Sequence, residues 1–264
     1  YGLVGSEMCI RDSLSAVLAA CARWSCYSDG DKRKAETTPL ERFDKKELHA
    51  AFEVLLKATQ EGKVPGAVGA IVTPQGMASW RAYGYRCLEP ELLPMERDTV
   101  FDLASLTKMV ATTTSLCILL ERGQIRLDDR VSEYLPEFAR PDKKDLQVRH
   151  LVTHTSGLTW KPFFKTRTGR QEFMKAIAET PLQSPPGEKH AYGDPNFITL
   201  GLMIERITGQ TLDVFARENV FRPLGMRHTG FRPARATWKR CAATEACPWR
   251  QKVMWGEVHD ENAY

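Results

Sequence analysis

The amino-acid sequence predicts an α+β fold in which a small antiparallel sheet is followed by a long helical region. Residues 64–85 contain two apolar runs on either side of Pro74-Gln75-Gly76, a pattern typical of a β-hairpin. Residues 105–123 carry apolar side chains on nearly every side of a helix, which indicates a buried central helix. Two further helices are expected at 196–207 and 211–220, because glycine and proline signals follow each of them.

The first 43 residues are not expected to belong to this fold. Residues 1–13, "YGLVGSEMCIRDS", resemble a peptide that arises when adapter DNA is translated, and we expect them not to be native protein. The run from Leu18 to Cys21 resembles a bacterial lipobox, in which Cys21 would receive the lipid anchor. Residues 14–43 are therefore expected to be the remnant of an export signal followed by a polar linker. An alanine-rich segment without a targeting role is the alternative for the same residues.

The expected domain begins with a helix. Asp44 and Glu47 form a capping-box pattern, so the helix is expected to start after Asp44 and to end at Gly62. The hairpin at 64–85 follows it directly. The inward positions of the helix are Leu48, Phe52, Leu55 and Leu56.

The chain after the central helix is mostly helical. Residues 128–138 read as a short polar helix or turn, and residues 148–157 as a helix that ends at Gly157. A two-stranded hairpin is not stable alone, and the sequence after residue 225 offers too few strands to complete its sheet. We therefore expect further sheet strands beyond residue 264, so that residues 44–264 form a partial domain.

Composition excludes several classes of function. The 37 basic and 33 acidic residues leave a net charge of only +4 with both signs interspersed, which argues against a nucleic-acid partner. No apolar stretch is long enough to span a membrane as a helix. The seven cysteines are irregularly spaced and form neither a disulfide framework nor a zinc site, and a bridge between Cys241 and Cys247 is not expected.

The tetrapeptide Ser105-Leu106-Thr107-Lys108 is the first candidate for chemistry. Residues three apart on a helix lie on the same face, so the lysine is expected next to the serine hydroxyl. A lysine that has lost its proton helps to make a hydroxyl nucleophilic. The plain alternative is a serine at a helix start and a solvated lysine, and the tetrapeptide alone does not separate the two.

Tyr192 and Asp194 supply a second candidate, in a Gly/Pro-rich loop before the helix at 196–207. A tyrosine beside a lysine ammonium has its phenolate stabilised and serves as a general base or proton relay. Taken alone, Tyr192 is better interpreted as a packing residue on a loop.

Four segments in one order change this balance, and together they resemble the serine β-lactamase and penicillin-binding-protein superfamily. The resemblance is nearest to the class C-like branch, which also contains esterases and D-amino-acid peptidases, and it covers residues 45–264. The segments are Ser105-x-x-Lys108, "LVTHTSGL" at 151–158, Pro186-Gly187 leading to Tyr192-Gly193-Asp194, and "VFRPLGMRHTGF" at 220–231.

The resemblance implies a role for each residue. Ser105 is the acylated nucleophile and its backbone N–H is one half of the oxyanion hole, while Lys108 accepts the serine proton. Tyr192 shares the general-base and leaving-group proton work. Asp194 occupies a substrate-binding position that is asparagine in many members, so its charge state stays open. His154 is expected to stabilise a turn and not to act as a base.

The sequence departs from the family pattern at its end. The family has a third motif, a Lys/His-Thr/Ser-Gly triplet on a strand near the C-terminus. His228-Thr229-Gly230 has this composition but follows a loop segment, so we interpret it as a decoy and expect the true motif beyond residue 264. His259, Asp260 and Glu261 within one turn make a poor metal cage, and no metal or cofactor is expected.

The resemblance implies a serine hydrolase that works through a Ser105 acyl-enzyme on a peptide-like, β-lactam or ester carbonyl. A cell-wall D-alanyl peptidase or a β-lactamase-related enzyme is expected first, with a peptidoglycan peptide or small molecule as substrate and an exported location. The alternatives are a carboxylesterase of the same fold and a catalytically silent fragment or binding module. The sequence does not indicate an oligomeric state.

Overall fold

The computed structural model describes residues 44–73, 76–159 and 169–263. The predicted hairpin is confirmed: β1 (Gly66–Thr73) pairs antiparallel with β2 (Gly76–Cys87). A short third strand, β3 (Leu93–Pro94), pairs with the end of β2, so the sheet has the order β1-β2-β3. Within the described residues β1 is therefore an edge strand.

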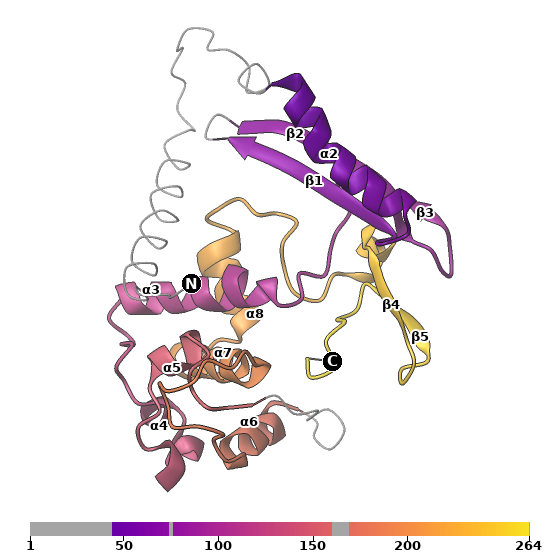
Figure 1. Ribbon diagram of the computed structural model, residues 1–264. Helices are drawn as coiled ribbons and strands as arrows, with labels where there is room; N and C mark the ends of the chain where they lie inside the picture. Colours follow the sequence, from indigo (N-terminus) through magenta and orange to yellow (C-terminus); the bar gives the residue numbers. More distant parts are fainter. Residues whose placement is uncertain (1–43, 74–75, 160–168, 264) are drawn as a thin grey trace, which may run out of the picture.

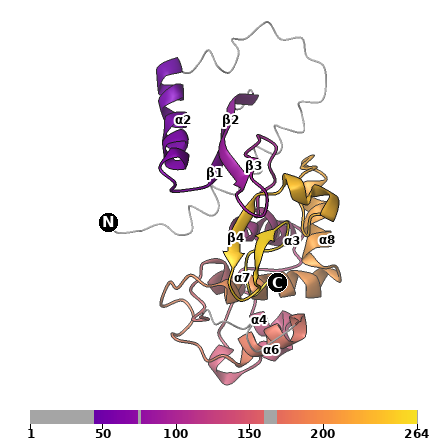
Figure 2. The same ribbon diagram turned by 90° about the vertical axis from the view of Figure 1, so that its right-hand side faces the viewer.

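Helix α2 (Lys45–Gln60) covers one face of this sheet, as Figures 1 and 2 show. Its start is the predicted one, because the Asp44 carboxylate accepts hydrogen bonds from the N–H groups of Lys46 and Glu47 at 2.7 and 3.3 Å. The helix approaches β1 closely at Gly69, where an added Cβ would lie 2.5 Å from the Leu55 side chain. Glycine at this position therefore permits the contact.

The helix that follows Ser105 is only partly the buried central helix expected. It begins with a π-helical segment, Lys108–Thr113, and continues as α3 (Thr114–Glu121). Leu119 in its second half is fully buried, but Leu106 and Met109 in its first turns are 60% and 59% exposed. The described chain packs α7 and α8 against one side of this helix, which leaves the first turns open on the other side.

The helical region contains two predicted helices at nearly the expected bounds. The helix expected at 196–207 is α7 (Asp194–Thr208), which ends at Gly209 in the left-handed conformation with φ +67°. The helix expected at 211–220 is α8 (Leu212–Ala216) and its π-helical continuation Arg217–Phe221. Residues 128–138 form the short helix α4 (Val131–Tyr134) and a 3₁₀ turn, as predicted.

Two helices differ from the expectation. Helix α5 (Val148–Val152) ends five residues before Gly157, because His154 adopts a left-handed conformation with φ +55° that stops the helix. Helix α6 (Arg170–Glu179) was not predicted. A 3₁₀ turn at Pro141–Lys143 lies between α4 and α5.

The main apolar core lies entirely within the helical region. Its members come from the second half of the central helix, from α4 to α6 with the turns between them, and from α7 and α8. Fully buried members include Leu119, Phe138, Leu151, Leu200 and Met203. This core fixes α3 against α7, and these two helices carry the candidate site between their N-terminal ends.

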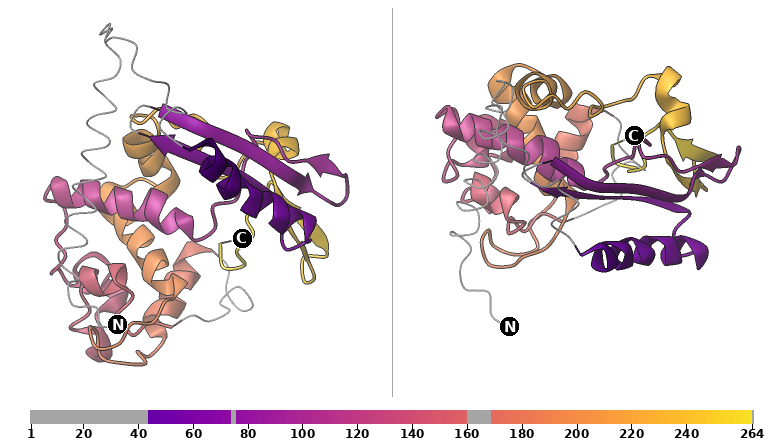
Figure 3. Two further views of the ribbon diagram at one scale, coloured as in Figure 1. Left: turned by 45° about the horizontal axis from the view of Figure 1, so that its top comes forward. Right: turned by 90° about the horizontal axis from the view of Figure 1, so that it is seen from above.

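A second small sheet closes the described chain. Strands β4 (Ala243–Cys247) and β5 (Lys252–Trp255) form an antiparallel hairpin after the 3₁₀ helix Arg235–Arg240, and the sequence analysis did not predict them. The views in Figures 1–3 place this hairpin beside the β3 end of the first sheet. A parallel bridge between Val100 and Cys241 joins it to the segment that leads to Ser105.

No helix of the described residues has both the length and the apolar character needed to cross a bilayer. Cys241 and Cys247 are buried free thiols in this structure. The predictions for residues 1–13, for the signal remnant and linker at 14–43, and for a lipid at Cys21 fall outside the described residues.

Candidate active site

Ser105 lies on a series of tight turns at the start of the central helix. The N–H of Leu106 bonds to the carbonyl of Leu103 at 2.9 Å, and the N–H of Lys108 bonds to the carbonyl of Ser105 at 3.0 Å. Side chains three residues apart overlap in such a turn. As a result, the Lys108 ammonium lies 3.0 Å from the Ser105 hydroxyl oxygen.

The second predicted segment meets this turn. The Tyr192 hydroxyl donates a hydrogen bond of 2.7 Å to the Ser105 oxygen, and Lys108 donates one of 2.7 Å to the Asp194 carboxylate. The Lys108 nitrogen also lies 5.0 Å from the centroid of the Tyr192 ring. The structure thus brings together all four residues that the sequence analysis selected.

The ion pair with Asp194 keeps Lys108 charged. Partial burial disfavours the ammonium, but the hydrogen bonds and negative charge of Asp194, together with Tyr192, outweigh burial and raise the pKa of Lys108 above its ordinary value. Lys108 therefore carries a proton at neutral pH, and in the resting state it donates to Ser105.

Helix α7 positions Asp194. This residue opens the helix after the extended Gly193, and Pro195 follows it in the first turn, where proline is well tolerated. A carboxylate in the first turn interacts favourably with the positive end of the helix dipole. The helix start therefore places an anion opposite Lys108.

His154 holds the loop that carries Tyr192. Its carbonyl accepts the N–H of Ala191 at 2.8 Å, and its Nδ1 accepts the N–H of Gly193 at 3.3 Å. Its ring lies 4.6 Å from the Tyr192 ring, centroid to centroid. Burial, together with the positive charge of Lys108 and neighbouring His190, lowers the pKa of His154, so the ring is neutral and Nδ1 is an acceptor. His154 thus stabilises a turn, and the turn is the one that presents Tyr192.

Asn196 also holds the loop that carries Tyr192, and the sequence analysis assigned it no role. It is fully buried, and its side-chain amide contacts the Gly193 carbonyl at 3.0 Å and His154 Nδ1 at 3.2 Å. Its oxygen accepts a bond of 2.5 Å from the Ser156 hydroxyl. An asparagine in the first turn of a helix also occurs on exposed surfaces, so the sequence held no signal for this burial.

The fold and site geometry agree with a comparison to protein families, in which the model described as Beta-lactamase matches residues 48–260. The chain belongs to this family. Its α+β fold is that of the serine β-lactamase and penicillin-binding-protein superfamily, as the resemblance implied.

Curated relatives of this β-lactamase family member include proteins named as a carboxypeptidase and as an amidase. A protein named putative D-alanyl-D-alanine carboxypeptidase from Escherichia coli (strain K12) is 35% identical over 193 residues, which cover 63% of the chain and 44% of the relative. A protein named N-acetylmuramyl-L-alanine amidase from Bacillus subtilis (strain 168) is 32% identical over 256 residues, covering 84% and 58%. The chain thus spans about half the length of these relatives.

Solved structures show the same fold in other β-lactamase-like proteins. EstCE1, a hydrolase with promiscuous acyltransferase activity, superposes with a TM-score of 0.67 and 25% identity over 81% of the chain and 59% of that protein. A class C β-lactamase superposes with a TM-score of 0.66 and 22% identity over 76% and 56%. The second match supports the fold alone.

The His228-Thr229-Gly230 triplet lies in irregular chain after the Arg217–Phe221 segment and not on a strand. This placement agrees with its interpretation as a decoy. Among the described residues no group of three or more His, Cys, Asp or Glu side chains is arranged to hold a metal ion.

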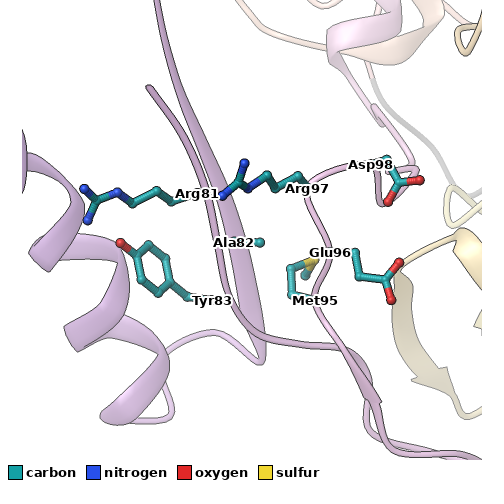
Figure 4. Close-up of a pocket in the computed structure, with 7 residues that line it drawn as sticks. All are labelled: Arg81, Ala82, Tyr83, Met95, Glu96, Arg97 and Asp98. Carbon is teal, nitrogen blue, oxygen red and sulfur yellow. The ribbon is translucent and has the colours of Figure 1, made fainter. Parts of the chain in front are cut away.

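The cavity in Figure 4 is separate from the candidate active site. It lies between β2 and residues 95–98, and its acids are already paired: Glu96 with Arg86 at 3.1 Å and Asp98 with Arg240 at 3.0 Å. None of the four candidate residues lines it. The lining residues are Arg81, Ala82, Tyr83, Met95, Glu96, Arg97 and Asp98.

Proposed function

We propose that Ser105 is the nucleophile of a serine hydrolase that forms an acyl-enzyme with a peptide-like, β-lactam or ester carbonyl. The observation that carries this proposal is the pair of short contacts at its oxygen, 3.0 Å to Lys108 and 2.7 Å to Tyr192. Two ionisable groups within hydrogen-bond reach of an exposed serine are what activation of a hydroxyl requires.

The first proton acceptor in this proposal is Tyr192, after the hydroxyl proton that it donates to Ser105 in the resting structure has left to solvent. Lys108 is held as an ammonium by Asp194, so it stabilises the phenolate and does not itself take the first proton. As Ser105 attacks the carbonyl carbon, its proton passes to the Tyr192 oxygen and then to the leaving amine or alkoxide. Water later cleaves the acyl-enzyme. This order differs from the one that the family resemblance implied, in which Lys108 accepts the serine proton.

The N–H of Ser105 is proposed as one donor to the tetrahedral oxyanion. Among the described residues no backbone hydrogen bond uses this N–H, so it is available to a substrate oxygen. The strand that carries the family's third motif is proposed to supply the second donor.

A D-alanyl peptide is the proposed substrate class. Relatives named D-alanyl-D-alanine carboxypeptidase support it, as does the relative named as an amidase of N-acetylmuramyl-L-alanine. A short or apolar ester is the second candidate. It is favoured by the similarity to EstCE1 and by the exposed apolar side chains of Leu106 and Met109 beside Ser105.

Three substrates decide between these candidates: a peptide ending in D-Ala-D-Ala, a chromogenic β-lactam and an activated aryl ester. We expect the wild-type chain to turn over at least one of them. Ser105→Ala should abolish it. Ser115→Ala is the matched control, because Ser115 lies buried on the same helix, and its hydroxyl has no hydrogen-bond partner in the described structure. Equal turnover by the Ser105→Ala variant would contradict the proposal, and no turnover by any form would favour a silent binding module.

We also propose export with a lipid anchor at Cys21. A cell-wall substrate lies outside the cytoplasm, and the lipobox-like run before Cys21 supports the same location. Incorporation of radioactive palmitate in a bacterial host, lost in Cys21→Ala, is the expected result. Incorporation that persists in Cys21→Ala would contradict it.

A further inference from the structure

Asp102 joins two segments that are far apart in the sequence. Its Oδ1 accepts the N–H of Ala104 at 2.7 Å, in the turn that leads into Ser105. Its Oδ2 accepts the N–H of His259 at 2.9 Å, in the last described segment of the chain. Both oxygens of one carboxylate are therefore used, each on a different segment.

The first contact supports a strained turn. Ala104 has φ +44°, in the left-handed region that non-glycine residues rarely adopt, and it directly precedes Ser105. A side-chain oxygen that accepts the N–H two residues later closes a local turn of this kind. The Asp102 carboxylate thus helps to set the direction of the Ser105 hydroxyl and backbone N–H.

The second contact holds residues 257–263 as a wall beside the site. The Arg250 guanidinium donates to the carbonyls of His259 and Asp260 at 2.9 and 3.2 Å. The Asp260 carboxylate accepts the N–H of Ala263 at 2.9 Å. Burial, and secondarily the charge of Asp194, raise the pKa of the Asp260 carboxyl.

We propose that Asp102 is a positioning residue that keeps the Ser105 turn and the 257–263 wall in one fixed arrangement. The inference rests on the proposed function, because it assigns Asp102 to the geometry of that nucleophile. The two hydrogen bonds explain why position 102 is an aspartate. Aspartate offers two acceptor oxygens, asparagine offers one, and alanine offers none.

The test compares Asp102→Asn and Asp102→Ala with Asp98→Asn in the 264-residue chain. Asp98 lies on the same segment, and its carboxylate pairs with Arg240, away from Ser105. The measured quantity is the rate constant at which an alkyl fluorophosphonate labels Ser105, together with the final labelled fraction. We expect the rate constant to fall about 10-fold in Asp102→Asn and about 100-fold in Asp102→Ala, and to stay unchanged in Asp98→Asn.

The final labelled fraction separates positioning from folding. A positioning role leaves this fraction and the melting temperature near the wild-type values, whereas a purely structural role lowers the fraction and leaves the rate constant of the remaining molecules unchanged. The second pattern would overturn the inference, as would wild-type rate constants in both Asp102 variants. The proposed function would be untouched by either result.

Hydrogen exchange supplies an independent readout. The amides of Ala104 and His259 should exchange faster in Asp102→Ala than in Asp98→Asn, because only the former loses their acceptors. Unchanged exchange at both amides would overturn the inference. If wild-type protein is not labelled at all, the proposed function fails and the positioning role with it, and exchange then reports only whether Asp102 connects the two segments.

Discussion

The helical region and the sheet region of this β-lactamase family member are packed very differently. All buried members of the main core lie between residues 116 and 215. Strand β1, by contrast, has no fully buried residue, and its outer edge has no partner strand among the described residues. Edge strands with open backbone groups are usually covered in natural proteins. The chemistry is therefore assembled on the half of the molecule that already has a complete core.

This difference shows which parts of the site depend on the described chain alone. Ser105, Lys108, Tyr192 and Asp194 all lie at the ends of helices fixed by the helical core. The sheet contributes none of the four. A cleft wall from a sheet strand, as the third family motif implies, is therefore a separate requirement from nucleophile activation.

The largest expected effect is on stability. Leu119→Ala removes a fully buried side chain from the helical core and should lower the free energy of unfolding by about 2–5 kcal/mol. Val72→Ala on β1 truncates a side chain that is 56% exposed and should change it by less than about 0.5 kcal/mol. Urea unfolding of both variants measures the contrast, and equal losses would show that the two regions are equally packed.

A substitution at His154 is expected to lower activity while the apolar core of the helical region stays intact. The variant His154→Phe keeps a ring beside Tyr192 but cannot accept the N–H of Gly193, so labelling of Ser105 should slow about 10- to 100-fold. His150→Phe is the control, since the His150 ring accepts the N–H of Gln147 at the start of α5. Equal slowing in both variants would refute a specific role for His154.

The pH dependence of labelling tests the role of Asp194. Its carboxylate raises the pKa of Lys108 through a hydrogen bond and through its negative charge, and the same charge opposes the loss of a proton that the proposed step requires. In Asp194→Asn this negative charge is absent, so a proton is lost more readily and the acidic limb of the rate profile should move to lower pH. A limb that stays in place or moves to higher pH would contradict the proposed proton pathway.

The smallest effect is expected at a buried charge of the helical region. Lys143 is fully buried and donates to Asp142 at 2.6 Å and to the Thr180 carbonyl at 2.8 Å. In Asp142→Asn a charged acceptor becomes a neutral one, which should cost about 1 kcal/mol at neutral pH. The hydrogen bond from Lys143 lowers the pKa of Asp142 in the folded state.

That depressed pKa fixes the sign of the pH dependence. The stabilisation is complete above the ordinary aspartate pKa and is lost as pH falls through the lower folded-state value. The difference in melting temperature between wild type and Asp142→Asn should therefore shrink in acid. A difference that grows with acidity would argue against this ion pair.

Local signals in the sequence predicted the fold well. The start of α2 follows from the Asp44 cap, the hairpin from its Pro-Gln-Gly turn and the end of α7 from Gly209, and each of these is decided by a few neighbouring residues. The hairpin of β4 and β5 was missed because its strands are too short to show a period. The exposure of Met109 was missed because an apolar pattern does not reveal whether chain elsewhere covers it.

The candidate site was predictable only in part. The spacing of Ser105 and Lys108 and the family resemblance indicated the four central residues. The supporting residues gave no such signal: Asn196 depends on tertiary burial, and Asp102 on a contact with His259. Contacts between distant segments arise from the assembled fold and leave no local pattern.

The most direct test of this account is to locate the covalent adduct. The chain is treated with an alkyl fluorophosphonate, digested, and the modified peptide is sequenced by mass spectrometry, with Ser105→Ala and Ser115→Ala in parallel. We expect one adduct per chain, at Ser105, absent in Ser105→Ala and retained in Ser115→Ala. An adduct on another residue, or one that persists in Ser105→Ala, would show that the nucleophile is not the serine that Lys108 and Tyr192 contact.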